Sequence, residues 1–250
     1  MTNPSLLLLH GFGQNGSIWD PIAAHMGKRV ICAPDLRGHR NASALRPIST
    51  ETLVSDVLAL AREMNAPILA GYSMGGRVAM RAALAEPKLF SGLVLISTSA
   101  GIEDPQDRAE RIERDEELAV ALEETGHEGF ETIWQQAPLW SGDVSRVMES
   151  AQSTRETTPA DDLAASLRGF GSGQVAPVWS RLPSIALPTL IVCGGRDATY
   201  CRHAGRMTEL IKAATLETIP GAGHSLPVES PAELAEAIER FSLQLRPEES

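Results

Sequence analysis

The sequence is poor in cysteine and in long apolar runs, and each shortage excludes a class of protein. Three cysteines among 250 residues are too few and too scattered for a disulfide framework or a paired-cysteine metal site. No apolar stretch approaches the roughly 20 residues that a membrane-spanning helix needs. The first residues show neither the basic segment nor the cleavage site of a secretory signal. We therefore expect a cytoplasmic protein with reduced cysteines, in which Cys32 and Cys193 are buried core thiols.

Positive charge is also in short supply. The chain carries 22 lysines and arginines against 32 aspartates and glutamates, which gives a formal net charge of −10. This balance disfavours nonspecific binding to nucleic acid or to an anionic membrane. An anionic substrate would have to be attracted by cations placed locally. The apolar content of 43% is that of an ordinary globular chain, so a disordered protein is excluded.

Short apolar runs alternate with helical patterns along much of the chain. Strands are predicted at residues 5–10, 29–35, 66–72, 93–97, 187–193 and 215–219. Helices are predicted at residues 52–64, 74–85 and 231–243. The apolar runs are continuous, as expected of parallel strands that are buried on both faces. The pattern predicts an α/β fold with a mostly parallel central sheet that helices cover.

The character of the sequence changes between residues 101 and 183. This segment is rich in arginine and glutamate and contains no convincing strand. Its patterns predict helices at residues 107–125, 129–136, 144–155 and 160–167. We therefore expect a single α/β core made of residues 1–100 and 184–250, with residues 101–183 inserted as a helical cap.

A serine between glycines follows the third predicted strand and precedes a helix. The segment GYSMG, residues 71–75, matches the G-x-S-x-G pattern of a nucleophile elbow. In such an elbow a sharp turn presents the hydroxyl of the serine, here Ser73, at the edge of the sheet. The flanking glycines let the strand and helix backbones approach without a side-chain clash. An ordinary strand–helix turn with a chance serine is the alternative interpretation.

The serine needs a base that takes its proton, and the base needs an acid that orients it. His224 follows the last predicted strand, so it is expected at the same edge of the sheet. Asp197 follows the strand at 187–193 and is the predicted acid, with Glu103 and Asp104 as alternatives. The chain order serine, aspartate, histidine is the order found in enzymes that carry the serine on such an elbow.

The loop after the first strand has two possible roles. The backbone amides of Phe12 in this loop and of Met74 after the serine are the predicted donors of an oxyanion hole. Residues 11–16 also match the G-x-G-x-x-G dinucleotide pattern, and Asp35 stands nineteen residues after Gly16. Pro21 would break the helix that a dinucleotide site requires. A dinucleotide site would also leave the serine, aspartate and histidine unexplained, so we favour the oxyanion role.

Five motifs in this order resemble the α/β-hydrolase superfamily over nearly the whole chain. They are HGFG at 10–13, PDLRGH at 34–39, GYSMGGRVAM at 71–80, GGRD at 194–197 and GAGH at 221–224. The resemblance implies an α/β-hydrolase fold in which the inserted helices cover the active site. The elbow residue is serine rather than aspartate, which argues against the haloalkane dehalogenases of the superfamily.

Further segments are similar to a narrower family, the 2-succinyl-6-hydroxy-2,4-cyclohexadiene-1-carboxylate (SHCHC) synthases of the menaquinone pathway. Besides the elbow, they are DRAERIERDEEL, FETIWQQAPLW and STRETTPADDLAASLRGFGSGQ, all in the predicted cap. This resemblance implies that the serine, aspartate and histidine eliminate pyruvate instead of hydrolysing an ester. It also implies substrate contacts at Tyr72, Arg77, Arg111, Trp134 and Arg155.

The acidic balance of the chain gives an independent reason to expect arginines at the site. A substrate with several carboxylates needs fixed cations, and the arginine fork binds a carboxylate bidentately. Arg77 comes one helical turn after the serine and can face the same cavity. Arg111 and Arg155 stand in charged helical stretches, where they could instead be solvated.

The predicted function is that of a lyase that eliminates pyruvate from 2-succinyl-5-enolpyruvyl-6-hydroxy-3-cyclohexene-1-carboxylate to give SHCHC. Such an enzyme requires no metal or organic cofactor, and its partner is a small multi-carboxylate substrate. A carboxylesterase or enol-lactonase is the first alternative, because it would use the same triad through an acyl-enzyme. A non-catalytic small-molecule receptor on the same fold is the second.

Overall fold

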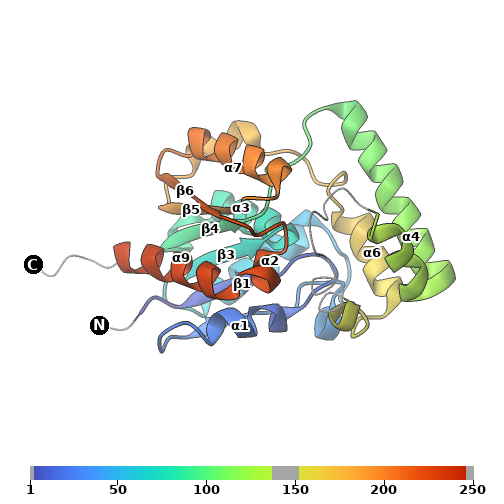
Figure 1. The fold of residues 1–250 in the computed structure, drawn as a ribbon, viewed down its shortest axis with the longest axis horizontal. Coiled ribbons are helices and arrows are strands. Elements are labelled where there is room, and N and C mark those ends of the chain that lie inside the picture. The colour runs from blue at the N-terminus through green and yellow to red at the C-terminus, as the bar shows by residue number, and fades with distance from the viewer. Residues whose placement is uncertain (1–2, 137–151, 246–250) are drawn as a thin grey trace, which may run out of the picture.

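A parallel sheet forms the centre of the protein in the computed structural model, which describes residues 3–136 and 152–245 (Figure 1). Within these residues six strands follow the order β2-β1-β3-β4-β5-β6, and every neighbouring pair is parallel. The strands are β1 (Leu6–Leu9), β2 (Ile31–Cys32), β3 (Ile68–Tyr72), β4 (Gly92–Ile96), β5 (Thr189–Gly194) and β6 (Ala214–Ile219). The predicted α/β fold is therefore confirmed. β2 is much shorter than predicted because it is an edge strand, paired with β1 alone.

Helices cover both faces of the sheet. Leu7 and Leu9 of β1 join one apolar cluster, and Leu6 and Leu8 join the other, which explains the continuous apolar runs. One face is packed by α2 (Thr50–Arg62), α3 (Met74–Ala85) and α7 (Ala198–Leu210), and the other by α1 (Asp20–Ala23), α8 (Leu226–Glu229) and α9 (Pro231–Gln244). Short 3₁₀ turns lie at Gly16–Trp19, Arg40–Ala42, Pro87–Leu89 and Trp179–Ser184. Within the described ranges no helix is long and apolar enough to cross a membrane.

The inserted helices stand together at one end of the molecule, opposite the two chain termini (Figure 1). α4 (Pro105–Trp134) packs on α6 (Ala160–Phe170) through a small apolar cluster of its own. α4 joins the two helices predicted at 107–125 and 129–136, with a kink at Gly126, where φ is 67°. Most of the helix predicted at 144–155 lies outside the described residues. We retain 101–183 as the proposed limits of the cap, although Trp179 already packs in a core cluster beside the sheet.

The cysteine expectation needs correction. Cys193, at the end of β5, forms a disulfide with Cys201 of α7, so it is not a free core thiol. Cys32 is free but only half-buried. The pairing could not be read from the sequence, because it depends on α7 turning back beside β5 after a short loop. Asp197, one of the predicted site residues, therefore lies in the loop that the disulfide closes.

The parallel arrangement brings the predicted site together. In a parallel sheet the carboxyl ends of all strands lie at one edge, where ligands of such folds bind. The loop with Phe12 leaves β1 at this edge, and Ser73 follows β3 directly. Asp197 follows β5 and His224 follows β6. The chain enters the cap after β4 and returns to β5, so the cap is attached at the same edge.

Candidate active site

Ser73 sits in a strained turn between β3 and α3. Its φ of 51° lies in the left-handed region that favours glycine, and the surrounding backbone holds it there. The Ser73 amide donates to the Ile96 carbonyl (2.9 Å), and the Thr98 hydroxyl donates to the Ser73 carbonyl (2.8 Å). A Cβ on Gly75 would lie 2.3 Å from the Leu9 carbonyl oxygen, so the glycine is required by close approach.

A hydrogen-bonded chain joins the predicted serine, histidine and aspartate. His224 Nε2 lies 3.1 Å from Ser73 Oγ, and His224 Nδ1 lies 2.8 Å from Asp197 Oδ2. The carboxylate can only accept, so Nδ1 carries the proton and Nε2 is left to accept from the serine hydroxyl. His224 and Asp197 are both buried. This arrangement can move a proton away from the Ser73 hydroxyl.

The alternative acids lie elsewhere. Asp104 caps the amino terminus of α4, where its Oδ1 accepts from the amides of Gln106 (2.8 Å) and Asp107 (3.0 Å). Glu103 is exposed and pairs with Arg206 at 2.5 Å. Neither carboxylate lines the cavity described below, so Asp197 is the acid that the fold brings to His224.

Phe12 and Met74 both lie at the carboxyl edge of the sheet, after β1 and β3. Met74 is the first residue of α3, so its N–H has no partner within the helix. The Phe12 N–H likewise donates no hydrogen bond to a residue that the structure describes. The amides on either side of it are occupied, since Gly11 N donates to Gln14 Oε1 (3.2 Å) and Gly13 N to His39 Nε2 (3.1 Å). Since neither amide has an acceptor among residues 3–136 and 152–245, both can stabilise negative charge on a bound oxygen.

A cavity of about 620 Å³ lies over these groups, between the sheet edge and the cap. This size is typical of small-molecule sites. All ten residues predicted for the site line it: Phe12, Tyr72, Ser73, Met74, Arg77, Arg111, Trp134, Arg155, Asp197 and His224. The roles of these residues remain predictions, and the fold places all of them around this cavity. No set of three or more potential metal ligands of the His, Cys, Asp or Glu type occurs among the described residues.

Arg77 is buried at the floor of the cavity without a carboxylate partner in the described residues. Its guanidinium donates to Ser172 Oγ (2.8 Å) and to the Phe170 carbonyl (3.3 Å), and it lies over the Phe170 ring. Its Nε is buried and has no hydrogen-bond partner in the described part of the chain. Burial lowers the pKa of Arg77 to about 10, so the group stays charged at neutral pH. A buried cation of this kind is a natural partner for an anionic group of a ligand.

The other two predicted arginines differ from Arg77 because each already has a carboxylate. Arg111 Nε donates to Asp115 Oδ1 (2.8 Å) within α4. Arg155 is almost fully buried, and its Nε donates to Glu131 Oε1 at 2.6 Å. Neither arginine is simply solvated, which was the alternative interpretation. The Arg111–Asp115 pair has the four-residue spacing of neighbours on a helix. The Arg155–Glu131 pair could not be inferred in this way, because it joins segments that are 24 residues apart.

The aromatic residues of the site are held by different means. Tyr72 is buried under His224, and its hydroxyl lies 3.3 Å from Ser225 Oγ. Trp134 stacks on Phe130 and packs against Phe12, so the cap reaches the oxyanion loop through this ring. Sequence reasoning missed Tyr200, whose ring centroid lies 4.4 Å from that of His224 and whose side chain lines the cavity. Its position three residues after Asp197 is the signal that could have found it.

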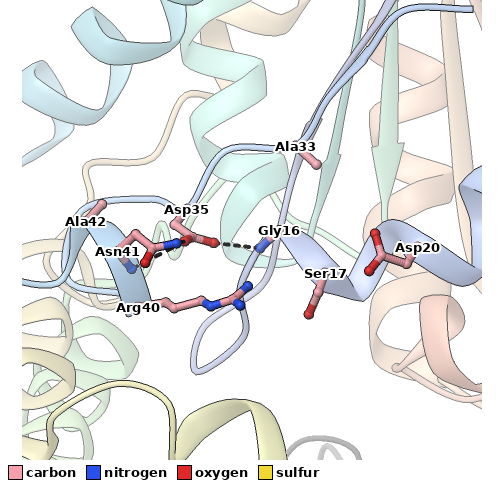
Figure 2. A pocket seen from close by; sticks show the side chains of 8 residues that line it. All are labelled: Gly16, Ser17, Asp20, Ala33, Asp35, Arg40, Asn41 and Ala42. Atoms are coloured by element: carbon pink, nitrogen blue, oxygen red, sulfur yellow. Dashed lines mark hydrogen bonds between the residues drawn. The ribbon is translucent and has the colours of Figure 1, made fainter.

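A second, open pocket of about 550 Å³ lies on the outer side of the oxyanion loop (Figure 2). In it Gly16 N donates to Asp35 Oδ1 (2.9 Å), and Asn41 donates to Asp35 Oδ2 (2.8 Å). The last glycine and the acidic residue of the nominal dinucleotide pattern are therefore bonded to each other. Gly16 begins a 3₁₀ turn, and the next helix has four residues with Pro21 in its first turn. This geometry lacks the long helix amino terminus that a dinucleotide pyrophosphate requires.

The fold and the arrangement of Ser73, His224 and Asp197 are those of a serine-elbow enzyme on an α/β sheet. A family model described as "Alpha/beta hydrolase family" matches residues 6–237. The chain belongs to this family, as the motifs of the sequence predicted.

Comparison with individual proteins narrows the relationship. The chain is 31% identical to a putative SHCHC synthase of Bacillus subtilis over 95% of its own length and 89% of the relative's. It is 29% identical to the SHCHC synthase of Salmonella typhimurium, over 94% of this chain and 92% of that protein. The solved structure of MenH from S. aureus has a TM-score of 0.92 at 28% identity, with 99% of this chain and 96% of that chain covered. An enol-lactonase from Burkholderia xenovorans, at 22% identity and a TM-score of 0.81, shares the fold.

Proposed function

We propose that this protein acts as an SHCHC synthase, which eliminates pyruvate from 2-succinyl-5-enolpyruvyl-6-hydroxy-3-cyclohexene-1-carboxylate in menaquinone biosynthesis. One observation carries the proposal: the cavity that holds the Ser73–His224–Asp197 chain also holds the buried Arg77, whose guanidinium pairs with no carboxylate among the residues that the structure describes. An esterase for neutral substrates has no use for that cation, whereas a multi-carboxylate substrate does. The names of the Bacillus and Salmonella relatives support the same assignment.

The reaction begins with proton abstraction. His224, oriented by Asp197, draws the proton of Ser73, and this pair removes the ring proton next to the succinyl carbonyl. The electrons of that C–H bond form a new ring double bond, and the existing double bond shifts by one position. The bond between the ring and the enolpyruvyl oxygen breaks, and pyruvate enolate leaves with the electron pair. Protonation of the enolate gives pyruvate, and the ring is left as the diene of SHCHC.

The remaining groups stabilise charge and hold the substrate. The Phe12 and Met74 amides face the negative charge that develops on the succinyl carbonyl oxygen. Each such donor typically contributes roughly 10²–10³ in rate, and general acid–base catalysis contributes roughly 10²–10⁴. Arg77 binds a carboxylate directly, while Arg111 and Arg155 present cations whose field is moderated by Asp115 and Glu131. Residues 101–183 act as the cap that closes this cavity, and Tyr72 and Trp134 form part of its wall.

Pyruvate release tests the proposal. The enolpyruvyl substrate is generated in place from isochorismate and 2-oxoglutarate, and release is compared between the wild-type protein, Ser73→Ala and the spontaneous reaction. We expect fast release at micromolar substrate that depends on Ser73. A wild-type rate equal to the spontaneous rate would contradict the lyase assignment.

A carboxylesterase or enol-lactonase is the second candidate, because Ser73 Oγ at 3.1 Å from His224 Nε2 is also placed for nucleophilic attack. Such an enzyme forms an acyl-enzyme and therefore shows a burst of the first product. A panel of carboxylate-bearing esters and lactones distinguishes the two candidates. A burst on one of them together with no pyruvate release would favour the hydrolase. A receptor without catalysis would show neither activity, and its Ser73 would not react with a fluorophosphonate.

A further inference from the structure

Two buried histidines lie beneath the loop that carries Phe12, and the proposed mechanism assigns neither of them a role. His10 follows β1, and His39 stands at the start of the Arg40–Ala42 turn. Both side chains are fully buried, and their ring centroids are 5.0 Å apart. No carboxylate of the described ranges bonds to either ring. Such a buried pair of polar rings is costly unless each ring nitrogen has a suitable partner.

The backbone partners of the two rings fix their protonation state. His10 Nδ1 lies 2.8 Å from the Gly11 carbonyl, and the Leu36 amide donates to His10 Nε2 (2.9 Å). His39 Nδ1 lies 3.2 Å from the Arg37 carbonyl, and the Gly13 amide donates to His39 Nε2 (3.1 Å). A carbonyl can only accept and an amide N–H can only donate, so each ring carries its proton on Nδ1 and a lone pair on Nε2. Both histidines are therefore neutral and in the same tautomer.

These bonds tie down the loop on both sides of Phe12. Before it, the Gly11 carbonyl accepts from His10, and the Gly11 amide donates to Gln14 Oε1. After it, the Gly13 amide donates to His39, whose ring also packs edge-on against the Phe12 ring. The Phe12 amide is left between two occupied amides and, among the described residues, has no acceptor. It is the amide of this loop that remains free to face the cavity.

We propose that His10 and His39 are positioning residues that, as neutral imidazoles, hold the Phe12 amide in place for the oxyanion of the reaction. The inference rests on the proposed function in one respect: it takes Phe12 as an oxyanion donor. Neither histidine touches the substrate, because neither side chain lines the cavity. Their effect passes through the Gly11–Gly13 backbone.

The surroundings of His10 and His39 disfavour a positive charge on either ring. Protonation of His10 at Nε2 would set an N–H group against the Leu36 N–H, and that hydrogen bond would be lost. Protonation of His39 at Nε2 would in the same way remove the hydrogen bond from the Gly13 amide. Burial lowers the pKa of His10 to about 4, although Asp35 and the bond to the Gly11 carbonyl act in the opposite direction. Burial and the neighbouring His10 lower the pKa of His39 to about 3, against the bonds to backbone groups. Both rings thus stay neutral throughout the range in which an enzyme of this kind works.

The test compares His39→Leu, which removes the acceptor for Gly13 N, with His39→Gln, whose Oε1 can replace it. We expect His39→Leu to lower kcat for pyruvate release about 10- to 100-fold, since a misplaced group costs about 10² in rate, with KM within about twofold of wild type. His39→Gln should recover most of the loss. His25→Leu, at an exposed histidine that does not line the cavity, is the control for loss of an imidazole.

A second readout separates this inference from the lyase assignment. The rate at which a fluorophosphonate labels Ser73 also depends on the oxyanion hole, but not on the natural substrate. If the wild-type protein is labelled and releases no pyruvate, the proposed function fails, and slower labelling of His39→Leu would still support the inference. Equal labelling rates for wild type, His39→Leu and His39→Gln would overturn it.

A measurement on the wild-type protein covers the case in which His39→Leu does not fold. Nitrogen-15 NMR of the histidine rings reports both the protonation state and the tautomer. We expect two rings to remain neutral, with the proton on Nδ1, from pH 7 down to about pH 5. A protonated ring at either position within this range, or the opposite tautomer, would contradict the proposed support of the loop.

Discussion

The sheet edge and the cap hold their functional groups in different ways. At the edge, the backbone does the positioning: Ser73 sits in a strained turn, and Phe12 and Met74 contribute main-chain amides. In the cap, ion pairs between side chains position the groups: Asp115 holds Arg111, and Glu131 holds Arg155. The carboxylates that fix these arginines also cancel much of their charge. In the proposed function, the edge therefore performs the chemical step and the cap selects the anion that binds.

The sheet region buries more apolar side chains than the cap does. The sheet is enclosed by two large apolar clusters, one on each face. The cap has one small cluster, in which Leu118, Leu122 and Phe130 of α4 meet Leu163 and Leu167 of α6. Because burial of apolar area is the main source of stability, the core should tolerate loss of a polar contact better than the cap does. The predictions below test this contrast, from the largest expected effect to the smallest.

The largest effect should come from the sheet edge. Ser73→Ala and His224→Ala should each lower kcat for pyruvate release by at least about 10²–10⁴, because either change removes the proton relay. The thermal unfolding temperature should change little, since the elbow backbone is unaffected. Steady-state kinetics with substrate generated in place gives kcat. Ser91→Ala is the matched control, because Ser91 precedes β4 at the opposite edge of the sheet. A small loss in Ser73→Ala would show that the edge does not perform the chemistry.

The next effect concerns the buried pair of the cap. Glu131→Gln leaves the Arg155 guanidinium buried without its counter-charge, and breaking such a pair typically costs about 3–5 kcal/mol. We expect a clear loss in the free energy of unfolding, measured by urea denaturation. The double variant Glu131→Gln with Arg155→Met should be more stable than Glu131→Gln alone, because the uncompensated charge is gone. If Glu131→Gln unfolds at the wild-type urea concentration, the pair does not hold the cap in place.

A third effect separates Arg77 from the arginines that have partners. Arg77→Met should raise KM roughly 10- to 100-fold, since a hydrogen bond to a charged group contributes about 1.5–3 kcal/mol. The KM of Arg77→Lys should lie between those of the wild type and Arg77→Met, because lysine keeps the positive charge but cannot bind a carboxylate bidentately. Arg81→Met is the control: Arg81 lies one turn further along α3, donates to the Arg77 and Ala176 carbonyls, and does not line the cavity. An unchanged KM in Arg77→Met would remove Arg77 from substrate binding.

The same contrast explains what could be predicted from the sequence. Strands, elbow and triad follow local rules: a buried parallel strand is a continuous apolar run, and the sharp turn at Ser73 needs Gly75. The parallel sheet then places Asp197 and His224 at one edge without further information. Individual ion pairs in the cap, such as Glu131 with Arg155, depend on how helices distant in sequence meet. The disulfide of Cys193 escaped prediction because it depends on how α7 turns back beside β5. The neutral state of His10 and His39 escaped it because the amides that bond their Nε2 atoms, those of Leu36 and Gly13, lie 26 residues away in the sequence.

The smallest effect should come from the most conspicuous charge cluster of the cap. Arg168 of α6 pairs with Glu116 and Glu123 of α4, and these bonds raise the pKa of the Arg168 guanidinium. All three side chains are more than a third exposed, so water and salt screen the attraction. Arg168→Met should therefore change the free energy of unfolding by less than about 1 kcal/mol, and the difference should shrink further in 0.5 M salt, where the Debye length lies between the roughly 8 Å of physiological salt and the roughly 3 Å of 1 M salt. A loss as large as that of Glu131→Gln would mean that exposed ion pairs stabilise the cap as much as the buried pair does.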